Sequence, residues 1–132
     1  MVRYLLDTDA IIDYLTGIQT SVSLIRNFHQ RGDLLCVCDV VIAEVYAGLR
    51  PQDRGKVQRL LNAFCFLPTG PEAAQQAGEW RYVYARQGIT ISTTDVLIAA
   101  TAHAHGATVV TGNIEDYPMS EVSVLTLPRA RQ

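Results

Sequence analysis

Acidic residues stand beside apolar runs at four places in this sequence of 132 residues. These acidic residues and one neighbouring amide are Asp7, Glu44, Asp95, Asn113 and Asp116. Their side chains offer oxygen ligands, which hard divalent cations prefer. If the fold brings them together, they predict an oxygen-rich site that suits Mg²⁺ or Mn²⁺ better than Zn²⁺.

Asp7 and Glu44 are the two acids that local structure explains least. Asp7 follows the apolar run 2–6, whereas Asp9 directly precedes the next apolar positions and is the better candidate for a helix N-cap. Glu44 lies in the stretch VVIAEVYAG, with no Lys or Arg three or four residues away. A carboxylate buried there without a partner would be costly, and a cation would stabilise it. The alternative for Glu44 is an ordinary outward-facing position in a helix.

Asp95 and Asn113 have stronger structural explanations. Ser92 and Asp95 have the spacing of a capping box, so Asp95 can serve purely to start a helix. Asn113 follows an apolar run and suits a turn or a cap. Asn113 and Asp116 are three residues apart and would share a face in a helical turn, with Glu115 pointing elsewhere. The case for these residues as ligands therefore depends on the other acids.

Histidine and cysteine do not provide a zinc site in this sequence. His29 stands alone, and His103 and His105 are two residues apart at a predicted helix end, so they point to different faces. Cys36 and Cys38 would share one face of a strand. Of a soft-metal site and simple packing, we favour packing, because free cysteine is among the most buried residue types.

The elements that must position the acids alternate between short apolar runs and helical periodicity. Strands are expected at 2–6, 34–38, 64–67, 108–111 and 122–125, and helices around 10–16, 22–28, 40–49, 57–64, 73–88 and 95–105. This alternation predicts an α/β fold with a central, mainly parallel sheet of four to five strands flanked by helices. Ligands of such sheets bind beyond the carboxyl ends of the strands, where Asp7 and Asn113 would lie.

The composition favours one globular domain over residues 1–132. The hydrophobic fraction of 48% is enough for one continuous core. The formal net charge of −2 argues against an overall basic surface that binds nucleic acid, so any RNA contact must be local. No apolar run approaches the ~20 residues that cross a bilayer, and the early aspartates interrupt any signal peptide, so we expect a soluble cytoplasmic protein without a membrane partner.

The order of these motifs resembles the PIN domain family, and most closely its VapC-type toxins from bacterial and archaeal toxin–antitoxin pairs. The resemblance covers nearly the whole chain. The segments that carry it are Leu6-Asp7-Thr8-Asp9, Ala43-Glu44-Val45-Tyr46-Ala47-Gly48, Thr94-Asp95-Val96-Leu97-Ile98-Ala99-Ala100, Val109-Val110-Thr111-Gly112-Asn113 and Asp116-Tyr117. Each motif is weak alone, but their order and spacing together are specific.

This resemblance implies a metal-dependent endoribonuclease that hydrolyses RNA phosphodiester bonds with Mg²⁺ or Mn²⁺. It implies that Asp7, Glu44 and Asp95 bind the metal and take part in catalysis, with Asp116 as a further acid. Family members often have an aspartate where Asn113 stands, so whether Asn113 or Asp116 fills the fourth position stays open, as does a second ion. The resemblance also implies a homodimer and a small antitoxin protein that blocks the site.

Other polar residues have possible supporting roles. The hydroxyls of Thr8 and Thr111 could position water or a phosphate, although hydrogen bonding within a turn is the simpler use for both. A local basic stretch could follow an RNA backbone, or it could be a solvated helix face. Its members are Arg50, Arg54, Lys56 and Arg59.

Two alternative functions start from the same residues. A phosphatase of the haloacid-dehalogenase type would use Asp7 of Leu-Leu-Asp-Thr-Asp as a covalent nucleophile, but it needs a lysine near the site. The only lysine, Lys56, lies in a charged stretch that we expect to be exposed. The second alternative is a non-catalytic PIN-like interaction module, because a fold does not fix a function.

Overall fold

A five-stranded parallel sheet forms the centre of the computed structural model, which describes residues 1–128. The strand order is β3-β2-β1-β4-β5, and every neighbouring pair is parallel. The strands are β1 (Arg3–Leu6), β2 (Leu34–Cys38), β3 (Cys65–Leu67), β4 (Ala107–Thr111) and β5 (Val124–Thr126). The predicted α/β class is confirmed, and the sheet is wholly rather than mainly parallel.

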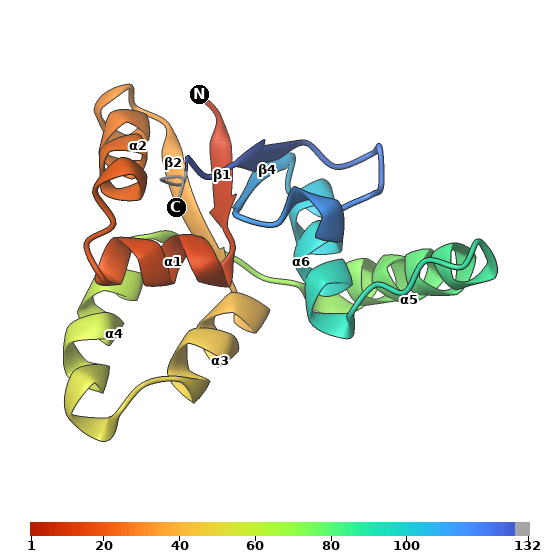
Figure 1. The fold of residues 1–132 in the computed structure, drawn as a ribbon, viewed down its shortest axis with the longest axis horizontal. Helices are drawn as coiled ribbons and strands as arrows, with labels where there is room; N and C mark the ends of the chain where they lie inside the picture. Colours follow the sequence, from red (N-terminus) through yellow and green to blue (C-terminus); the bar gives the residue numbers. More distant parts are fainter. Residues whose placement is uncertain (129–132) are drawn as a thin grey trace.

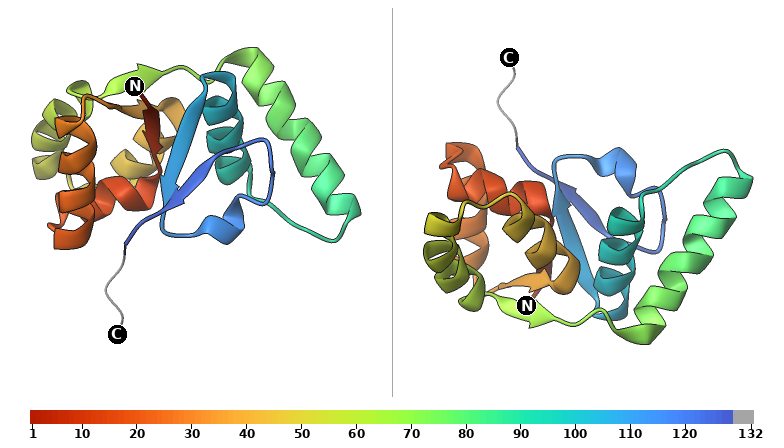
Figure 2. Two further views of the ribbon diagram at one scale, coloured as in Figure 1. Left: turned by 90° about the horizontal axis from the view of Figure 1, so that it is seen from above. Right: turned by 90° about the horizontal axis from the view of Figure 1, so that it is seen from below.

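Helices cover both faces of this sheet. They are α1 (Thr8–Leu15), α2 (Gln19–Gln30), α3 (Asp39–Ala47), α4 (Arg54–Asn62), α5 (Gly70–Arg86) and α6 (Thr93–Ala104), with short 3₁₀ helices η1 (Pro51–Asp53) and η2 (Ile114–Asp116). Figure 2 shows α1 and α2 on one side of the strands and α6 with α5 on the other. Within residues 1–128, no helix has both the length and the apolar character that crossing a bilayer requires.

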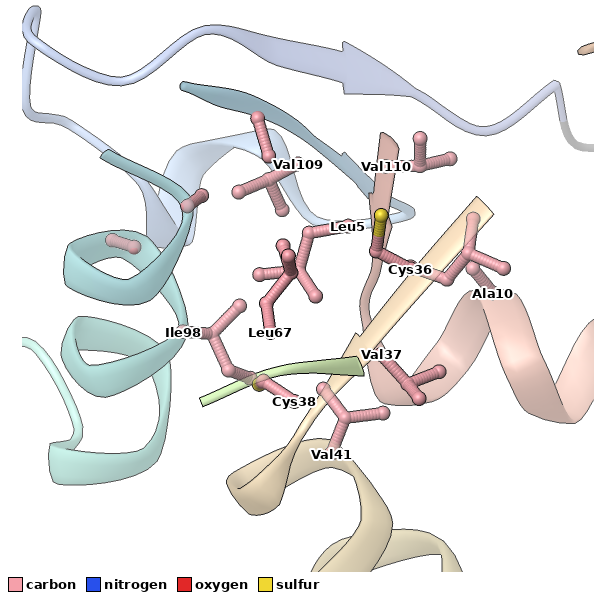
Figure 3. Close-up of a cluster of buried hydrophobic side chains, with 14 of the residues drawn as sticks. Leu5, Ala10, Cys36, Val37, Cys38, Val41, Leu67, Ile98, Val109 and Val110 are labelled. Carbon is pink, nitrogen blue, oxygen red and sulfur yellow. The ribbon is translucent and has the colours of Figure 1, made fainter. Parts of the chain in front are cut away.

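The core lies between the central strands and these helices. Leu5 of β1, Val109 of β4 and Ile98 of α6 are fully buried, and Figure 3 shows Leu5, Leu67 and Ile98 gathered between the sheet and α6. Because β1 and β4 are covered on both faces, their sequences are continuous apolar runs rather than alternating ones. The same burial fixes the register that pairs Leu6 with Val110, which places the ends of the two strands side by side.

The cysteines are packing residues of this core. Cys36 and Cys38 are fully buried, and burial raises the pKa of the Cys38 thiol to about 11. Cys36 is in register with Cys65 on the neighbouring strand β3. All three are free cysteines. Protonated, buried thiols agree with the packing interpretation rather than with a soft-metal site.

All six helices begin one to three residues before the predicted starts, and the caps explain the difference at α1 and α3. Helix α1 begins at Thr8 rather than Ala10, because Asp7, and not Asp9, has the extended N-cap conformation and accepts a hydrogen bond from the Thr8 backbone N–H. Helix α3 has Cys38 at its N-cap position, without a side-chain cap. The Asp39 carboxylate instead accepts hydrogen bonds from the backbone N–H and the hydroxyl of Thr69, which joins the start of α3 to the start of α5.

Candidate active site

Asp7 lies at the centre of the candidate site, at the junction of β1 and α1. Its side chain is 8% exposed. Its Oδ1 accepts a 2.7 Å hydrogen bond from the Thr8 backbone N–H, and its Oδ2 accepts bonds from the hydroxyls of Thr111 (2.9 Å) and Tyr117 (2.8 Å). A buried carboxylate is costly unless hydrogen bonds stabilise the charge, and here three donors do so. Asp7 is therefore both a helix cap and a fixed anion at the carboxyl ends of β1 and β4.

Glu44 approaches this site from α3. Its Oε1 accepts a 2.5 Å hydrogen bond from the Thr8 hydroxyl, so the residue after Asp7 orients it. Contrary to the possibility of a buried carboxylate, the Glu44 side chain is exposed to solvent. The alternative prediction, that Glu44 has an ordinary outward-facing position in a helix, is therefore confirmed. The apolar neighbours of Glu44 in the sequence pack on the other sides of α3, where Val41 and Val45 are buried.

Asp95 enters the site from the first turn of α6. The Ser92 hydroxyl accepts a hydrogen bond from the Asp95 backbone N–H, which confirms the predicted cap. The Asp95 carboxylate itself interacts with the Ser92 side chain and with the charges of the other acids. Its pKa is raised, first by burial and then by the negative charges of Asp116, Asp7 and Glu44. Asp95 can therefore take part in the cap of α6 through its backbone and belong to the acidic cluster through its side chain.

Asp116 and Asn113 occupy the two ends of η2, beyond the end of β4. Burial, Glu115 and Asp7 raise the pKa of the Asp116 carboxyl. Asn113 is exposed, and its backbone N–H, rather than its side chain, donates to the Thr111 hydroxyl. The structure therefore brings Asp116 into the electrostatic field of Asp7 and Asp95, and Asn113 takes a turn position.

A pocket of about 320 Å³ opens beside Asp95 and Asp116. Ser92, Ile91 and Glu115 also line it, so Glu115 lies near the site rather than away from it. A larger pocket of about 540 Å³ lies among α1, α2, β2 and α4, and contains none of the four clustered carboxylates. The smaller pocket is the candidate site, because it is lined by two of these carboxylates, Asp95 and Asp116.

The basic stretch lies away from these acids. Arg54, Lys56 and Arg59 are exposed on α4, and Arg50 forms an ion pair with Asp53 in η1. Figure 1 shows α4 on the opposite side of the molecule from α5 and α6, with α3 between them. The fold does not bring these residues into the acidic cluster.

Among residues 1–128, no basic side chain forms an ion pair with the acids of the cluster. In residues 1–128, the ion pairs are Arg31–Asp33 and Arg50–Asp53, and neither involves a clustered acid. Over the same residues, no group of three or more His, Cys, Asp or Glu side chains is arranged so that it could hold a metal ion. The donor chemistry still fits a hard divalent cation, because burial and neighbouring negative charges raise the pKa of Asp95 and of Asp116, and an added positive charge would relieve this repulsion.

Sequence reasoning gave no site role to Tyr117 or Asp9. Tyr117 is buried and donates to Asp7, and the Asp7 charge together with burial raises the pKa of its phenol. Asp9 Oδ2 accepts a 2.7 Å hydrogen bond from the Gly112 backbone N–H, which holds the loop after β4 against α1. The sequence feature that could have indicated Tyr117 is its position directly after Asp116. A buried tyrosine hydroxyl usually has a polar partner.

Comparison with known proteins identifies several relatives of this chain. The sequence model of the PIN domain matches residues 4–122. Ribonuclease VapC10 of Mycobacterium tuberculosis is 32% identical over 117 residues, which cover 89% of this chain and 87% of that protein. Ribonuclease VapC2 of Haemophilus influenzae is 25% identical over 122 residues, covering 89% and 91%.

Solved structures share the same fold. The crystal structure of VapBC2 from Rickettsia felis, bound to a DNA fragment from its promoter, contains a chain that matches with a TM-score of 0.83 at 20% identity, covering 95% of this chain and 98% of that one. A chain of the DNA-bound VapBC from Salmonella typhimurium matches with a TM-score of 0.82 at 21% identity, covering 97% and 100%.

Proposed function

Because this chain belongs to the PIN domain family, we propose that it is a metal-dependent endoribonuclease and the toxin of a toxin–antitoxin pair. The observation that carries the proposal is the position of Asp95, whose pKa is raised first by burial and then by the charges of Asp116, Asp7 and Glu44. These four acids come from four separate parts of the chain, and Asp7 and Asp116 follow the carboxyl ends of β1 and β4. The names of its relatives, ribonucleases VapC10 and VapC2, support RNA as the substrate.

The four carboxylates would hold Mg²⁺ or Mn²⁺ at this edge of the sheet. Such a cation, when bound, lowers the pKa of a water ligand and offsets negative charge on a phosphodiester. Asp7 provides a pre-oriented carboxylate, since three hydrogen bonds fix it. Glu44 and Asp95 approach from the two helices on either side, and the exposure of Glu44 leaves room for substrate.

In this proposal, two threonine hydroxyls hold carboxylates of the site in position. Thr8 donates its hydroxyl hydrogen to Glu44, and Thr111 donates its hydrogen to Asp7. A hydroxyl has a single hydrogen to donate, so in this arrangement neither residue donates to a phosphate or a water. We infer that both threonines position the carboxylates.

The same family relationship supports a proposal for the protein partners of this chain. The structural relatives are complexes named VapBC, which supports a cognate antitoxin protein as the partner of this chain. We further propose a homodimer that acts in the cytoplasm. Arg54, Lys56 and Arg59 remain candidates for contacts to RNA outside the catalytic centre, because they form an exposed basic face on α4.

The decisive experiment measures cleavage of a structured RNA pool with Mg²⁺, with Mn²⁺ and with EDTA. It compares the wild type with Asp7→Asn and Asp95→Asn, and uses Asp53→Asn as a matched control outside the acidic cluster. We expect metal-dependent cleavage by the wild type and the control, and loss of cleavage in both site variants. Intact RNA under every condition, with folded and antitoxin-free protein, would favour a non-catalytic interaction module instead.

A further inference from the structure

Tyr117 makes the longest-range hydrogen bond within the candidate site. We propose that Tyr117 is a positioning residue whose hydroxyl fixes Oδ2 of Asp7, so that Oδ1 is the oxygen that meets the cation. This inference rests on the proposed function, since it concerns how the same site is prepared for its metal. It concerns one phenol oxygen and can be tested without RNA.

The hydrogen-bond count of Asp7 assigns different uses to its two oxygens. A carboxylate has about four lone-pair sites, two on each oxygen. On Oδ2, both are used by hydroxyls, at 2.9 Å from Thr111 and 2.8 Å from Tyr117. On Oδ1, the Thr8 backbone N–H uses one site at 2.7 Å. One lone pair of Oδ1 therefore remains for a cation, and the two hydroxyls prevent the carboxylate from rotating away.

Because Tyr117 is buried, its hydroxyl is a hydrogen-bond donor to Asp7 that solvent does not replace. Tyr117 is 5% exposed, so water cannot readily replace its hydroxyl next to Asp7. A phenol is protonated at neutral pH and donates its hydrogen to the carboxylate. The ring itself packs in the hydrophobic core. Phenylalanine at this position would keep the ring packing and lose only the hydrogen bond.

Tyr117 also connects Asp7 to the segment that carries Asp116. Its backbone N–H donates to the carbonyl oxygen of Ile114, which closes η2. At the other end of η2, the backbone N–H of Asn113 donates to the hydroxyl of Thr111. Both ends of this turn are thus linked to the same oxygen of Asp7, one through Thr111 and one through Tyr117. The arrangement sets the position of Asp116 relative to Asp7.

The test compares Mn²⁺ binding by the wild type, Tyr117→Phe and Asp7→Asn, measured by calorimetry on the full chain without RNA. Loss of a hydrogen bond that orients a metal ligand lowers affinity by roughly 10-fold to 100-fold. We expect Tyr117→Phe to weaken Mn²⁺ binding about 10-fold, and to lower the melting temperature because the buried Asp7 carboxylate loses one of its three donors, so binding is measured well below that temperature. Tyr84→Phe is the matched control, because Tyr84 is partly buried on α5 outside the acidic cluster.

A double variant tests whether Tyr117 affects Mn²⁺ binding through Asp7. If Tyr117 acts through Asp7, Tyr117→Phe should cause no further loss when Asp7 is already replaced by Asn. Thr111→Val removes the other hydroxyl from the same oxygen and should weaken Mn²⁺ binding to a similar degree, which keeps the test valid if Tyr117→Phe fails to fold.

The possible outcomes separate this inference from the proposed function. Wild-type affinity in Tyr117→Phe, or in Thr111→Val if Tyr117→Phe does not fold, would overturn the positioning role while leaving the metal site in place. A wild-type chain that binds Mn²⁺ no better than Asp7→Asn would instead contradict the metal-dependent function, and with it this inference.

Discussion

The hydroxyl of Thr8 donates a 2.5 Å hydrogen bond to Oε1 of Glu44, which joins the start of α1 to the middle of α3. The two residues are 36 positions apart in the sequence. Because Thr8 directly follows Asp7, this bond couples the position of Glu44 to that of the buried aspartate. Glu44 is exposed, so without this bond its flexible side chain would sample several rotamers in solvent.

Replacing Thr8 by Val should therefore weaken metal binding and RNA cleavage by roughly 10-fold, the usual effect of losing a bond that orients a ligand. Thr8→Ser keeps the hydroxyl and should retain nearly full activity. Metal titration of cleavage and a thermal melt would check both variants. Equal activity of the Val and Ser variants would show that Glu44 does not depend on Thr8.

Metal-free protein should be stabilised at neutral pH by Asp95→Asn. The folded-state pKa of Asp95 is raised, so its contribution to stability is full below the ordinary pKa of an aspartate and is lost as the pH rises through the raised value. At pH 7 the carboxylate is then a net cost, which Asn removes. We expect a gain below about 1 kcal/mol, because Asp95 is only partly buried and solvent screens its charge.

Denaturation at pH 7 and near pH 4 measures this effect, with Glu79→Gln, at an exposed position of α5, as the control. The advantage of Asp95→Asn should shrink at the lower pH. Saturating Mg²⁺ should reverse the order of stability, since a ligand at 100 times its Kd stabilises the native state by about 2.7 kcal/mol. An advantage that persists unchanged at low pH would rule out charge repulsion as its cause.

Asp116, and not Asn113, should be the fourth functional residue. Asp116 raises the pKa of Asp95, whereas Asn113 is exposed and uses its backbone N–H to bond Thr111. We expect Asp116→Asn to lower RNA cleavage at least 10-fold. Asn113→Ala should change it by less than about threefold, equivalent to under 1 kcal/mol. Single-turnover cleavage rates would decide, and the reverse ranking would transfer the role to Asn113.

Ser92 should contribute to stability through the N-cap of α6. Its hydroxyl accepts a hydrogen bond from the Asp95 backbone N–H, and loss of such a cap costs about 1 kcal/mol. Ser92→Ala should lower the free energy of unfolding by that amount in urea denaturation. Asn caps helices as well as Ser does, so Ser92→Asn should restore stability. Failure of this rescue would show that the serine acts otherwise.

The sequence was sufficient for elements whose pattern is local. The strand at 34–38 was predicted with the bounds that the structure shows, because a buried parallel strand is a continuous apolar run between polar turns. The cap at Ser92 was also predicted, since its partner is three residues away. Local spacing is enough when both partners of an interaction lie within one turn.

Elements that depend on distant partners were not predictable in this way. Asp7 and Asp9 flank the same threonine, and only the packing of β1 against β4 decides which one caps α1. The Asp39 carboxylate binds Thr69, which is 30 residues away. Tyr117 bonds Asp7 across 110 residues, and no local pattern indicates such a pair.

The distance between Asp7 and Tyr117 along the chain also bears on protein synthesis. Asp7 leaves the ribosome long before Tyr117 does. Strand β1 cannot pair with β4 until β4 has been synthesised. A nascent chain that ends before residue 116 lacks one of the four acids. Until residue 116 has been added, the proposed site is incomplete, so the proposed activity cannot begin before that point of synthesis.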